Sequence, residues 1–439
     1  MKTTAGVAVA TLPKTLFPST VLGANERILT GHIGLGGMGK RDLQFVMLRD
    51  DMQPIVMCDL LEEHREQGAD ITEGKFNRPP TTAYFEEVIA NKDVDAVVIA
   101  TPDHWHALPV IMACEAGKDV YCEKPLATTI REGRAIVDAV HRNNTVFQLG
   151  TMQRSGPYFQ EAVELIRNGH IGTIARVETW AHDARPIGGL GNPPDEIPPE
   201  GLDWDRYVGW TPKVPYNRNR FLHNFRWFLD YSGGKITDWG THLIDIALWA
   251  MGEEKHPKSV TAMGGKYITQ DNTTVPDTLE VLWEFDDYVL SFSDRMYNPM
   301  PEGRGMHYGI LFHGTLGTMR VDRKGYEIFS FKHNGGCERK VVKNAKEMPM
   351  NTGHWENFAD CVRSRELPIC HVDIAHNTTS VCHMGTSAYV AGGRVHWDAE
   401  KQRFFGKDKP AVKKANAWAY RKYENGWSLE SPYYDDWKV

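Results

Sequence analysis

The chain has 439 residues, more than one hydrophobic core usually organises, so its length predicts two domains. Hydrophobic residues make up 41% of the chain and charged residues 24%, and the net charge of -7 is spread over both signs, as is typical of a globular protein. We find no basic patch for a nucleic-acid partner, and after the N-terminal stretch no apolar run approaches the roughly 20 residues of a membrane span.

The first 26 residues resemble an export signal. The stretch from Thr3 to Leu22 is uncharged except for Lys14, is rich in Ala, Val and Leu, and is followed by small residues at 23–24. Its flank resembles the interior of a twin-arginine signal that lacks the arginine pair. We therefore expect a periplasmic or otherwise exported protein. The alternative is a cytoplasmic protein whose apolar N-terminal arm packs on a neighbour.

Residues 27–150 alternate short apolar strands with amphipathic helical stretches, which predicts a doubly wound parallel sheet with helices on both faces. The expected strands are Ile28–Ile33, Pro54–Cys58, Ala96–Ala100, Asp119–Cys122 and Thr145–Leu149. Such sheets bind ligands at the carboxyl ends of their strands, so we expect functional residues directly after these strands.

A glycine-rich turn follows the first of these strands. The segment Gly34-Leu35-Gly36-Gly37-Met38-Gly39 has the pattern G-x-G-x-x-G and precedes a helical stretch, so its backbone can approach a pyrophosphate. Asp59 ends the second strand, where a carboxylate is expected to bind a ribose hydroxyl and to repel a 2'-phosphate. We therefore predict a Rossmann domain that binds NAD in preference to NADP. A glycine-rich turn without a ligand is the alternative.

Two further strand ends carry polar residues where the nicotinamide should lie. The first is Thr101-Pro102-Asp103-His104-Trp105-His106, and the second is Glu123-Lys124-Pro125. From these segments we assign Thr101, Pro102, His104, His106, Glu123 and Lys124 to cofactor binding.

Residues 151–439 change to a strand-rich order, which predicts an α+β domain on a large, mostly antiparallel open sheet with helices on one face. The expected strands are Ala175–Trp180, Ser259–Gly264, Thr278–Phe285 and Tyr288–Asp294. The irregular stretch 184–220 is long enough to suggest a functional segment or a subunit contact. Residues 352–390 are expected to be helical and to pack back on the first domain.

The segment from Gly233 to Asp245 opens a helix that carries two candidate reactive residues. Asp238 and His242 are four positions apart and therefore project from one face, where a carboxylate orients an imidazole and raises its basicity for proton removal. Asp245 lies on much the same face and is expected to orient the imidazole or to bind a substrate hydroxyl. The alternative is a buried aspartate at a helix start and a hydrogen-bonded core histidine.

Glu-Lys-Pro at residues 123–125, together with Asp238-x-x-x-His242, resembles the family of glucose–fructose oxidoreductase, inositol dehydrogenase and MocA (Gfo/Idh/MocA). The resemblance spans the chain from about Arg27 to the aromatic tail. It implies that Lys124 polarises the reacting oxygen and that Asp238 and His242 contact the substrate, with the histidine as acid/base. It also implies a cis Lys124–Pro125 bond and a homodimer or homotetramer formed through the second domain's sheet.

Several polar and aromatic residues are candidates for a wall that binds hydroxyl groups, which favours a carbohydrate or polyol substrate. We assign Gln153, Arg154, His182, Tyr216, Arg226, Trp227, Asp238, His242 and Asp245 to substrate binding. Each of them alone is equally consistent with an ordinary surface polar group.

No metal site is expected. The seven cysteines contain no C-x-x-C pair. The histidines at 104, 106, 371, 376 and 383 lack a carboxylate or thiolate at ligand spacing, so we interpret them as ordinary hydrogen-bonded side chains.

The sequence therefore predicts an NAD-dependent oxidoreductase that transfers a hydride from a secondary hydroxyl of a sugar, glycoside or cyclitol, with Lys124, Asp238 and His242 as catalytic residues. The alternative is a redox-assisted glycosidase or lyase that keeps NAD tightly bound and acts through transient C3 oxidation and elimination. It needs an extra base, for which His182, Asp183 and Tyr216 are candidates, and it ranks second because Glu-Lys-Pro is kept. A third possibility is a catalytically idle dinucleotide sensor.

Overall fold

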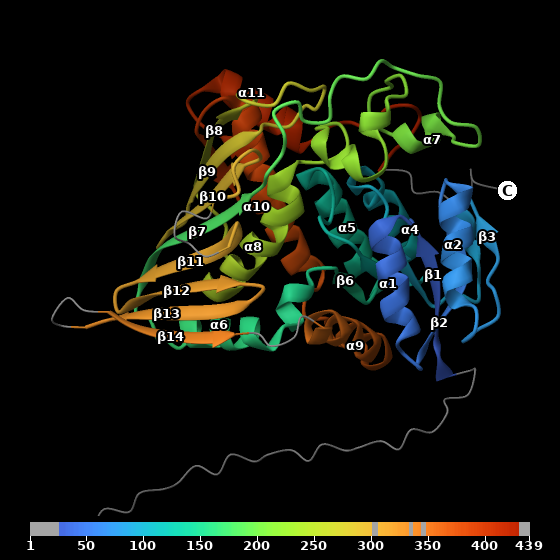
Figure 1. The fold of residues 1–439 in the computed structure, drawn as a ribbon, viewed down its shortest axis with the longest axis horizontal. Helices are drawn as coiled ribbons and strands as arrows, with labels where there is room; N and C mark the ends of the chain where they lie inside the picture. The colour runs from blue at the N-terminus through green and yellow to red at the C-terminus, as the bar shows by residue number, and fades with distance from the viewer. Residues whose placement is uncertain (1–25, 301–305, 333–336, 344–347, 430–439) are drawn as a thin grey trace, which may run out of the picture.

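The computed structural model describes residues 26–300, 306–332, 337–343 and 348–429. The predicted export signal or N-terminal arm lies outside these ranges except for its last residue. Two sheets organise the chain, one in each half, and several helices of the second half lie between them (Figure 1). Among the described helices, none is long and apolar enough to cross a membrane.

The N-terminal domain is built on a six-stranded parallel sheet with strand order β3-β2-β1-β4-β5-β6. Its strands are β1 (Ile28–Ile33), β2 (Met52–Cys58), β3 (Thr81–Thr82), β4 (Ala96–Ile99), β5 (Asp119–Cys122) and β6 (Phe147–Leu149). Its helices are α1 (Gly37–Met47), α2 (Glu62–Thr72), α3 (Phe85–Ala90), the short η2 (Asp103–Trp105), α4 (Ala107–Glu115) and α5 (Ile130–Asn143). The central strands β4 and β5 are buried throughout because helices cover both faces, which explains their continuous apolar sequence.

The C-terminal domain is built on a ten-stranded sheet with strand order β14-β13-β12-β11-β7-β10-β9-β8-β15-β16. Every neighbouring pair is antiparallel except β7 and β10. Its strands are β7 (Ile174–His182), β8 (Ser259–Gly265), β9 (Thr278–Glu284), β10 (Val289–Arg295), β11 (Tyr308–Gly314), β12 (Gly317–Asp322), β13 (Gly325–Phe331), β14 (Cys337–Lys343), β15 (Val395–Asp398) and β16 (Arg403–Phe405). The predicted fold class is thus confirmed in both halves.

The helices of this domain lie on the side of the sheet that is turned toward the N-terminal domain, and only some of them pack on the sheet itself (Figure 1). They are η3 (Met152–Ser155), α6 (Pro157–Arg167), α7 (Trp204–Val208), η4 (Arg218–Arg220), η5 (Leu222–Trp227), α8 (Lys235–Met251), α9 (Met348–Ser364), α10 (Val372–Ala391) and α11 (Lys409–Ala419). The largest core cluster joins α6, α8 and α10 to the inner face of the sheet. The outer face leaves apolar side chains exposed, with Met263 on β8 74% and Leu282 on β9 42% exposed.

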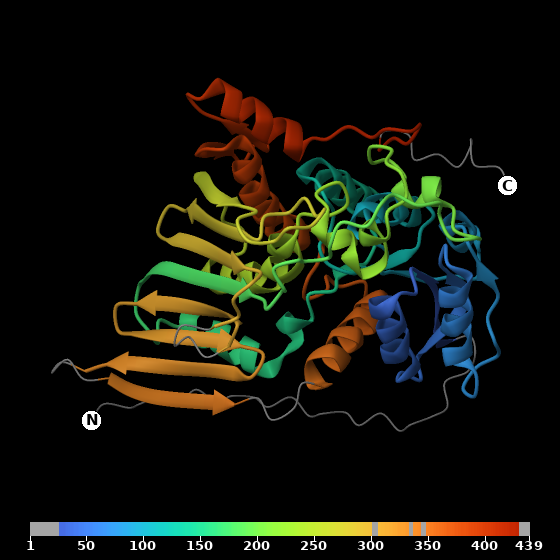
Figure 2. The same ribbon diagram turned by 45° about the horizontal axis from the view of Figure 1, so that its top comes forward.

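Two late segments return to the N-terminal domain. Helix α9 lies against it (Figure 2), and its Trp355 stacks on Tyr121 of β5 with ring centroids 4.0 Å apart. After α11 the chain crosses over, and Tyr423 stacks on Trp210 and donates a hydrogen bond to Glu132 at the start of α5. These contacts fix how the two domains face each other, and the cavity described next lies where they meet.

Candidate active site

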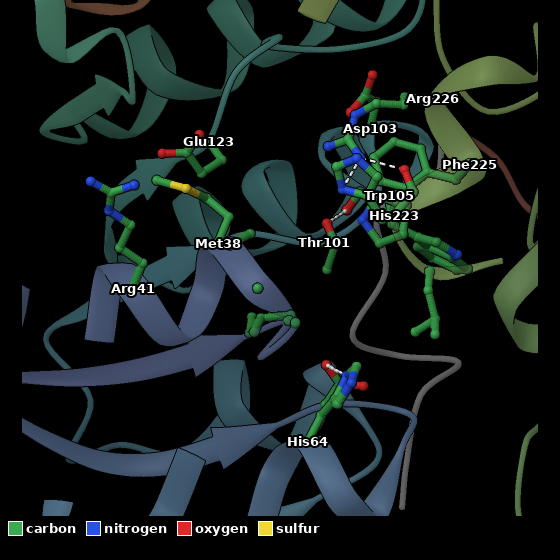
Figure 3. A pocket seen from close by; sticks show the side chains of 18 of the residues that line it. Met38, Arg41, His64, Thr101, Asp103, Trp105, Glu123, His223, Phe225 and Arg226 are labelled. Atoms are coloured by element: carbon green, nitrogen blue, oxygen red, sulfur yellow. Dashed lines mark hydrogen bonds and ion pairs between the residues drawn. The ribbon is translucent and has the colours of Figure 1, made fainter. Parts of the chain in front are cut away.

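A cavity of about 890 Å³ lies between the two domains at the carboxyl edge of the parallel sheet. Figure 3 shows side chains from both domains around it, with Met38, Arg41 and Glu123 on one side and Asp103, His223, Phe225 and Arg226 on the other. Its size is within the usual range for ligand and cofactor sites. Of the predicted residues, Gly34, Gly36, Gly37, Met38, Asp59, Thr101, Pro102, Glu123, Lys124, Arg226, Asp238 and His242 line it.

The glycine-rich turn has the geometry that a dinucleotide requires. Gly34 has a positive φ of 87°, and a Cβ there would meet the backbone of Ala100 and Thr101 at 2.7 Å. A Cβ on Gly39 would lie 1.9 Å from the Gly34 oxygen, so this glycine packs the helix against the turn and does not line the cavity. Gly36 and Gly37 have nothing within 4 Å of a Cβ position and line the cavity. They leave space in front of the α1 N-terminus, where a pyrophosphate would bind backbone N–H groups.

Asp59 is held at the end of β2 by the backbone around it. Its carboxylate accepts hydrogen bonds from the N–H groups of Leu35 at 2.7 Å and Leu61 at 2.9 Å. His64 Nδ1 lies 3.4 Å away and also lines the cavity. The carboxylate is therefore fixed where the adenosine ribose of a dinucleotide would lie.

A segment of the C-terminal domain, residues 203–227, crosses over the cofactor half of the cavity; we call it the strap. Its residues Arg206, Tyr207 and Phe221 line the cavity together with the glycine turn and Asp59. Arg206 forms an ion pair with Glu86 of α3, with 13% and 9% of the two side chains exposed. The strap thus encloses the groove that sequence reasoning assigned to NAD.

The strap is also held by the segment that follows β4. Trp105 Nε1 donates a hydrogen bond to the Tyr207 oxygen at 2.8 Å, and His104 Nε2 lies 2.8 Å from the same oxygen. Trp210 Nε1 donates to the His104 oxygen at 2.6 Å. These contacts explain why the irregular stretch predicted from the sequence is ordered against the first domain.

The structure places His104 and His106, which the sequence assigned to cofactor binding, outside the lining of the cavity. Neither side chain lines the cavity, and both are buried. His106 lies between the backbone oxygens of Pro125 and Thr101, at 2.6 and 3.0 Å. Burial lowers the pKa of His104 to about 3, so it is a neutral structural side chain. Both histidines contact loop backbone, and neither lines the cavity.

Lys124 and Asp238 join the two domains at the other end of the cavity. Lys124 Nζ lies 2.5 Å from Asp238 Oδ1 and 3.1 Å from the Asp238 backbone oxygen. The Lys124–Pro125 peptide is cis, as the family resemblance implied. Burial acts to raise the pKa of Asp238, but the charges of Lys124 and Arg226 outweigh it and hold this pKa well below its usual value. Asp238 is therefore ionised at neutral pH.

His242 lines the cavity one helical turn after Asp238, but no hydrogen bond joins the two described side chains. Asp238 is engaged by Lys124, and His242 Nδ1 has no hydrogen-bond partner among the described residues. Burial, followed by the charges of Lys124 and Arg323, lowers the pKa of His242 well below its usual value. The charge of Asp238 acts to raise this pKa, as expected, but burial and the charges of Lys124 and Arg323 outweigh it. The imidazole is neutral.

Six of the predicted substrate residues lie outside the cavity lining. They are Gln153, Arg154, His182, Tyr216, Trp227 and Asp245. Arg154 and Asp245 form a doubly hydrogen-bonded ion pair, with 1% of each side chain exposed, so neither reaches a ligand or His242. Gln153 Nε2 donates to the His242 backbone oxygen at 3.2 Å, which makes it a support for the site.

The other three residues pack elsewhere. Tyr216 belongs to an aromatic cluster inside the strap region, and Trp227 is covered by the Arg185 guanidinium at 3.4 Å. His182 is buried on β7 beside Ser293 and Arg295. The structure thus gives these six residues packing or supporting contacts and does not bring them into the lining of the cavity.

The cavity also contains residues that sequence reasoning missed. They are Arg41, His64, Asp103, Arg206, His223, Phe225, Trp239, Arg323, Met350 and Asn351. Asp103 and Trp239 lie in segments already singled out, after a strand and at a helix start; the others carry no local signal. Within the described ranges, no group of three or more His, Cys, Asp or Glu side chains is placed to hold a metal ion.

Comparison with known proteins agrees with this geometry. Residues 28–151 match the model of the oxidoreductase family with an NAD-binding Rossmann fold, and residues 210–320 match the GFO/IDH/MocA C-terminal domain. A scyllo-inositol 2-dehydrogenase (NAD(+)) of Bacillus subtilis is 28% identical over 290 residues, which is 64% of this chain and 72% of that protein.

A second relative is a 2,7-anhydro-N-acetylneuraminate hydratase of Mediterraneibacter gnavus, which is 26% identical over 244 residues, 54% of each chain. Among solved structures, a levoglucosan dehydrogenase in complex with NADH and levoglucosan has a TM-score of 0.65 at 20% identity. The match covers 84% of this chain and 99% of that one, and it shows a shared fold.

Proposed function

Because the chain belongs to the Gfo/Idh/MocA oxidoreductase family, we propose that it oxidises a secondary hydroxyl of a sugar, glycoside or cyclitol with NAD. The family's relatives include sugar and cyclitol dehydrogenases. The observation that carries the proposal is the Lys124–Asp238 pair, which faces the same cavity as the glycine turn.

The residues at this end of the cavity can bind and polarise a hydroxyl group. A bound nicotinamide supplies the hydride acceptor. Lys124 is held in place by Asp238, so it can donate a hydrogen bond to the reacting oxygen and stabilise the negative charge that develops there. His242 is neutral and lines the cavity, so it can bind a second polar group of the substrate. Trp239 and Phe225 provide apolar surface for the ring of a sugar.

The cofactor we propose is NAD and not NADP. Asp59 lies where the ribose is expected, and its carboxylate would repel a 2'-phosphate. We expect the dissociation constant for NADH to be smaller than that for NADPH by about tenfold or more, which corresponds to ~1.4 kcal/mol. Tighter binding of NADPH would contradict the role given to Asp59.

The function is tested by following reduced cofactor while a panel of cyclitols, anhydrosugars, aldoses and aryl glycosides is offered. In the Lys124→Met variant, kcat for the best substrate should fall by about 10²–10³-fold, the usual cost of losing one preorganised donor. NADH affinity should change much less, because the glycine turn and Asp59 are held by contacts that do not involve Lys124. Lys414→Met, on the exposed side of α11, is the matched control and should behave as wild type. Full turnover by Lys124→Met would refute the assignment.

A second candidate function, redox-assisted elimination with a retained cofactor, is favoured by the strap. Arg206 and Tyr207 cover the cofactor half of the cavity. An enclosed cofactor suits a reaction cycle that returns the hydride to the same substrate. Release of aglycone without accumulation of reduced cofactor would favour this function over the dehydrogenase.

We further propose that two copies of the chain associate through the outer face of the large sheet. Met263 and Leu282 are exposed there on adjacent strands, and exposed Val341 lies on β14 of the same sheet. Exposed apolar side chains of this kind favour a subunit contact. Light scattering should give the molar mass of a dimer or tetramer, and the Leu282→Lys substitution should shift the measured mass toward that of the monomer.

Export is proposed from the apolar stretch between Thr3 and Leu22. Fractionation of cells that express the full chain should place it outside the cytoplasm. A wholly cytoplasmic protein would favour the N-terminal arm instead.

A further inference from the structure

Asp103 lies beside the proposed reacting centre. It follows β4 at the start of η2 and lines the cavity, although only 6% of the residue is exposed. Ser232, just before α8, donates a hydrogen bond from Oγ to Asp103 Oδ2 at 2.5 Å. Figure 3 shows Asp103 on the side of the cavity where Phe225 and Arg226 lie. The carboxyl is thus held in place between the two domains with access to the cavity.

Oxidation of a hydroxyl releases a proton as well as a hydride, and the other groups at this end are poor acceptors for it. Asp238 is ionised and already bound to Lys124, so it has little affinity for a proton. Burial and nearby cations lower the pKa of His242 well below its usual value. The imidazole is therefore neutral and a weak base. A general base is most effective when its pKa lies near the working pH.

We propose that Asp103 is a second acid/base group of this site, which accepts the proton of the substrate hydroxyl during oxidation. The inference rests on the proposed function. In the step, the C–H bond breaks as the hydride passes to the nicotinamide, the O–H bond breaks, and a C=O bond forms. The hydroxyl proton is added to the Asp103 carboxylate, which afterwards releases it to solvent. In the reverse direction, the protonated carboxyl returns it to the ketone oxygen.

The electrostatic surroundings of Asp103 support this role. Burial raises the pKa of Asp103 to about 7, while the hydrogen bond from Ser232 and then the charges of Arg226 and Lys124 act to lower it. Asp238 acts to raise it. The carboxyl is therefore near half-ionised at neutral pH, as a reversible proton carrier needs to be.

The other groups that face this carboxyl are neutral in this pH range. Tyr207 of the strap and Cys122 at the end of β5 both interact with the charge of Asp103, and burial raises the pKa of each well above its usual value. His104, the next residue, is neutral because burial lowers its pKa to about 3. None of these three groups changes its charge near neutral pH, so a titration of the site near pH 7 is not assigned to them.

Glu123 is the competing assignment, since burial raises its pKa to about 7 as well. It lies on the side of the cavity with Met38 and Arg41 (Figure 3), toward the glycine turn, and beside the buried Asp42. Asp103 lies with the residues of the substrate end. The two carboxyls have similar proton affinities, so it is the position of Asp103 in the cavity that favours it over Glu123 as the acid/base group.

The test is the pH profile of hydride transfer, measured in single turnovers with NAD and the best sugar of the panel. Wild type should gain rate as the pH rises, with an inflection near 7. Asp103→Asn keeps the size of the side chain and should lose this inflection, with a rate lower by roughly 10²-fold. Ser232→Ala removes a hydrogen bond that lowers the pKa, so its inflection should move to higher pH.

Glu123→Gln is the matched comparison and should keep the inflection, whatever its rate. NADH affinity of each variant, measured by fluorescence titration, reports whether the cofactor site is intact. An inflection retained in Asp103→Asn, or lost only in Glu123→Gln, would overturn the proposal. Both results require hydride transfer by the wild type, so they differ from a failure of the proposed function, in which the wild type transfers no hydride at any pH.

Discussion

The ion pair between Arg206 and Glu86 makes a prediction about how long the cofactor stays bound. If a dinucleotide lies under the strap, the strap must move before it can leave. The pair is mostly buried, and the Glu86→Gln substitution keeps the shape of the side chain but removes its charge. A hydrogen bond to a charged group contributes about 1.5–3 kcal/mol, so opening should become easier by roughly 10–150-fold.

The rate of NADH release should rise by that factor in Glu86→Gln. It can be measured by stopped-flow fluorescence, with excess NAD to displace bound NADH, and the amount of nicotinamide that co-purifies with the protein should fall in parallel. Glu87→Gln is the matched control: it is the same substitution at the next position of α3, where the side chain is exposed and contacts Thr82. If Glu86→Gln lowers the thermal stability but releases NADH at the wild-type rate, the strap does not retain the cofactor.

Three further predictions concern the apo protein and its cofactor site. Gly39→Ala should lower the melting temperature because its Cβ would meet backbone at 1.9 Å, whereas Gly37→Ala should preserve it and weaken NADH binding in a calorimetric titration. Arg154→Met should lower the free energy of unfolding in urea by about 3–5 kcal/mol, because it leaves the Asp245 charge buried and unpaired. The stability of Asp103→Asn relative to wild type should increase as the pH rises from about 4 to 7, and thermal unfolding at each pH measures this difference.

The sign of the Asp103 effect follows from proton binding. Its pKa is about 7 in the folded protein and 3.8 ordinarily, so between these values the folded state holds a proton that the unfolded state has lost. Wild-type stability therefore falls across this interval, and an asparagine removes that contribution. Parallel pH curves for the two proteins would contradict the raised pKa.

For the Arg154–Asp245 ion pair, Arg134→Met is the control, because Arg134 and Asp138 are half exposed and such pairs contribute roughly 0–1 kcal/mol.

Local sequence patterns predicted the parts of the molecule that local forces determine. The strands β1 and β4 are short apolar runs bounded by polar turns, and the structure places them within a residue of the expected ends. The glycine turn was found because its conformation requires residues without a Cβ at fixed positions. Lys124 was singled out at a strand end and Asp238 by its helical spacing to His242, but only the family resemblance gave both a role at one reacting centre.

The substrate wall was predicted poorly because polar residues in a sequence do not reveal their partners. Arg154 and Asp245 are 91 positions apart and meet only when η3 packs on α8. Either residue alone is typical of a side chain that binds substrate hydroxyls. Only the ion pair with the other residue shows that its role is structural. Arg206 and Tyr207 of the strap, which line the cavity, had no signal either, since their position depends on contacts with Glu86 and Trp105 in the other domain.

The proton affinities of the site depend on the same contacts between domains. Lys124 of the first domain keeps Asp238 of the second ionised, and Ser232 of the second domain acts to lower the pKa of Asp103 in the first. If the domains moved apart, water would reach both carboxyls and each pKa would return toward its ordinary value. The pH dependence of hydride transfer therefore measures domain closure as well as chemistry. A variant that loosens the strap without touching Asp103, such as Glu86→Gln, should for this reason shift the inflection of the wild-type profile toward lower pH.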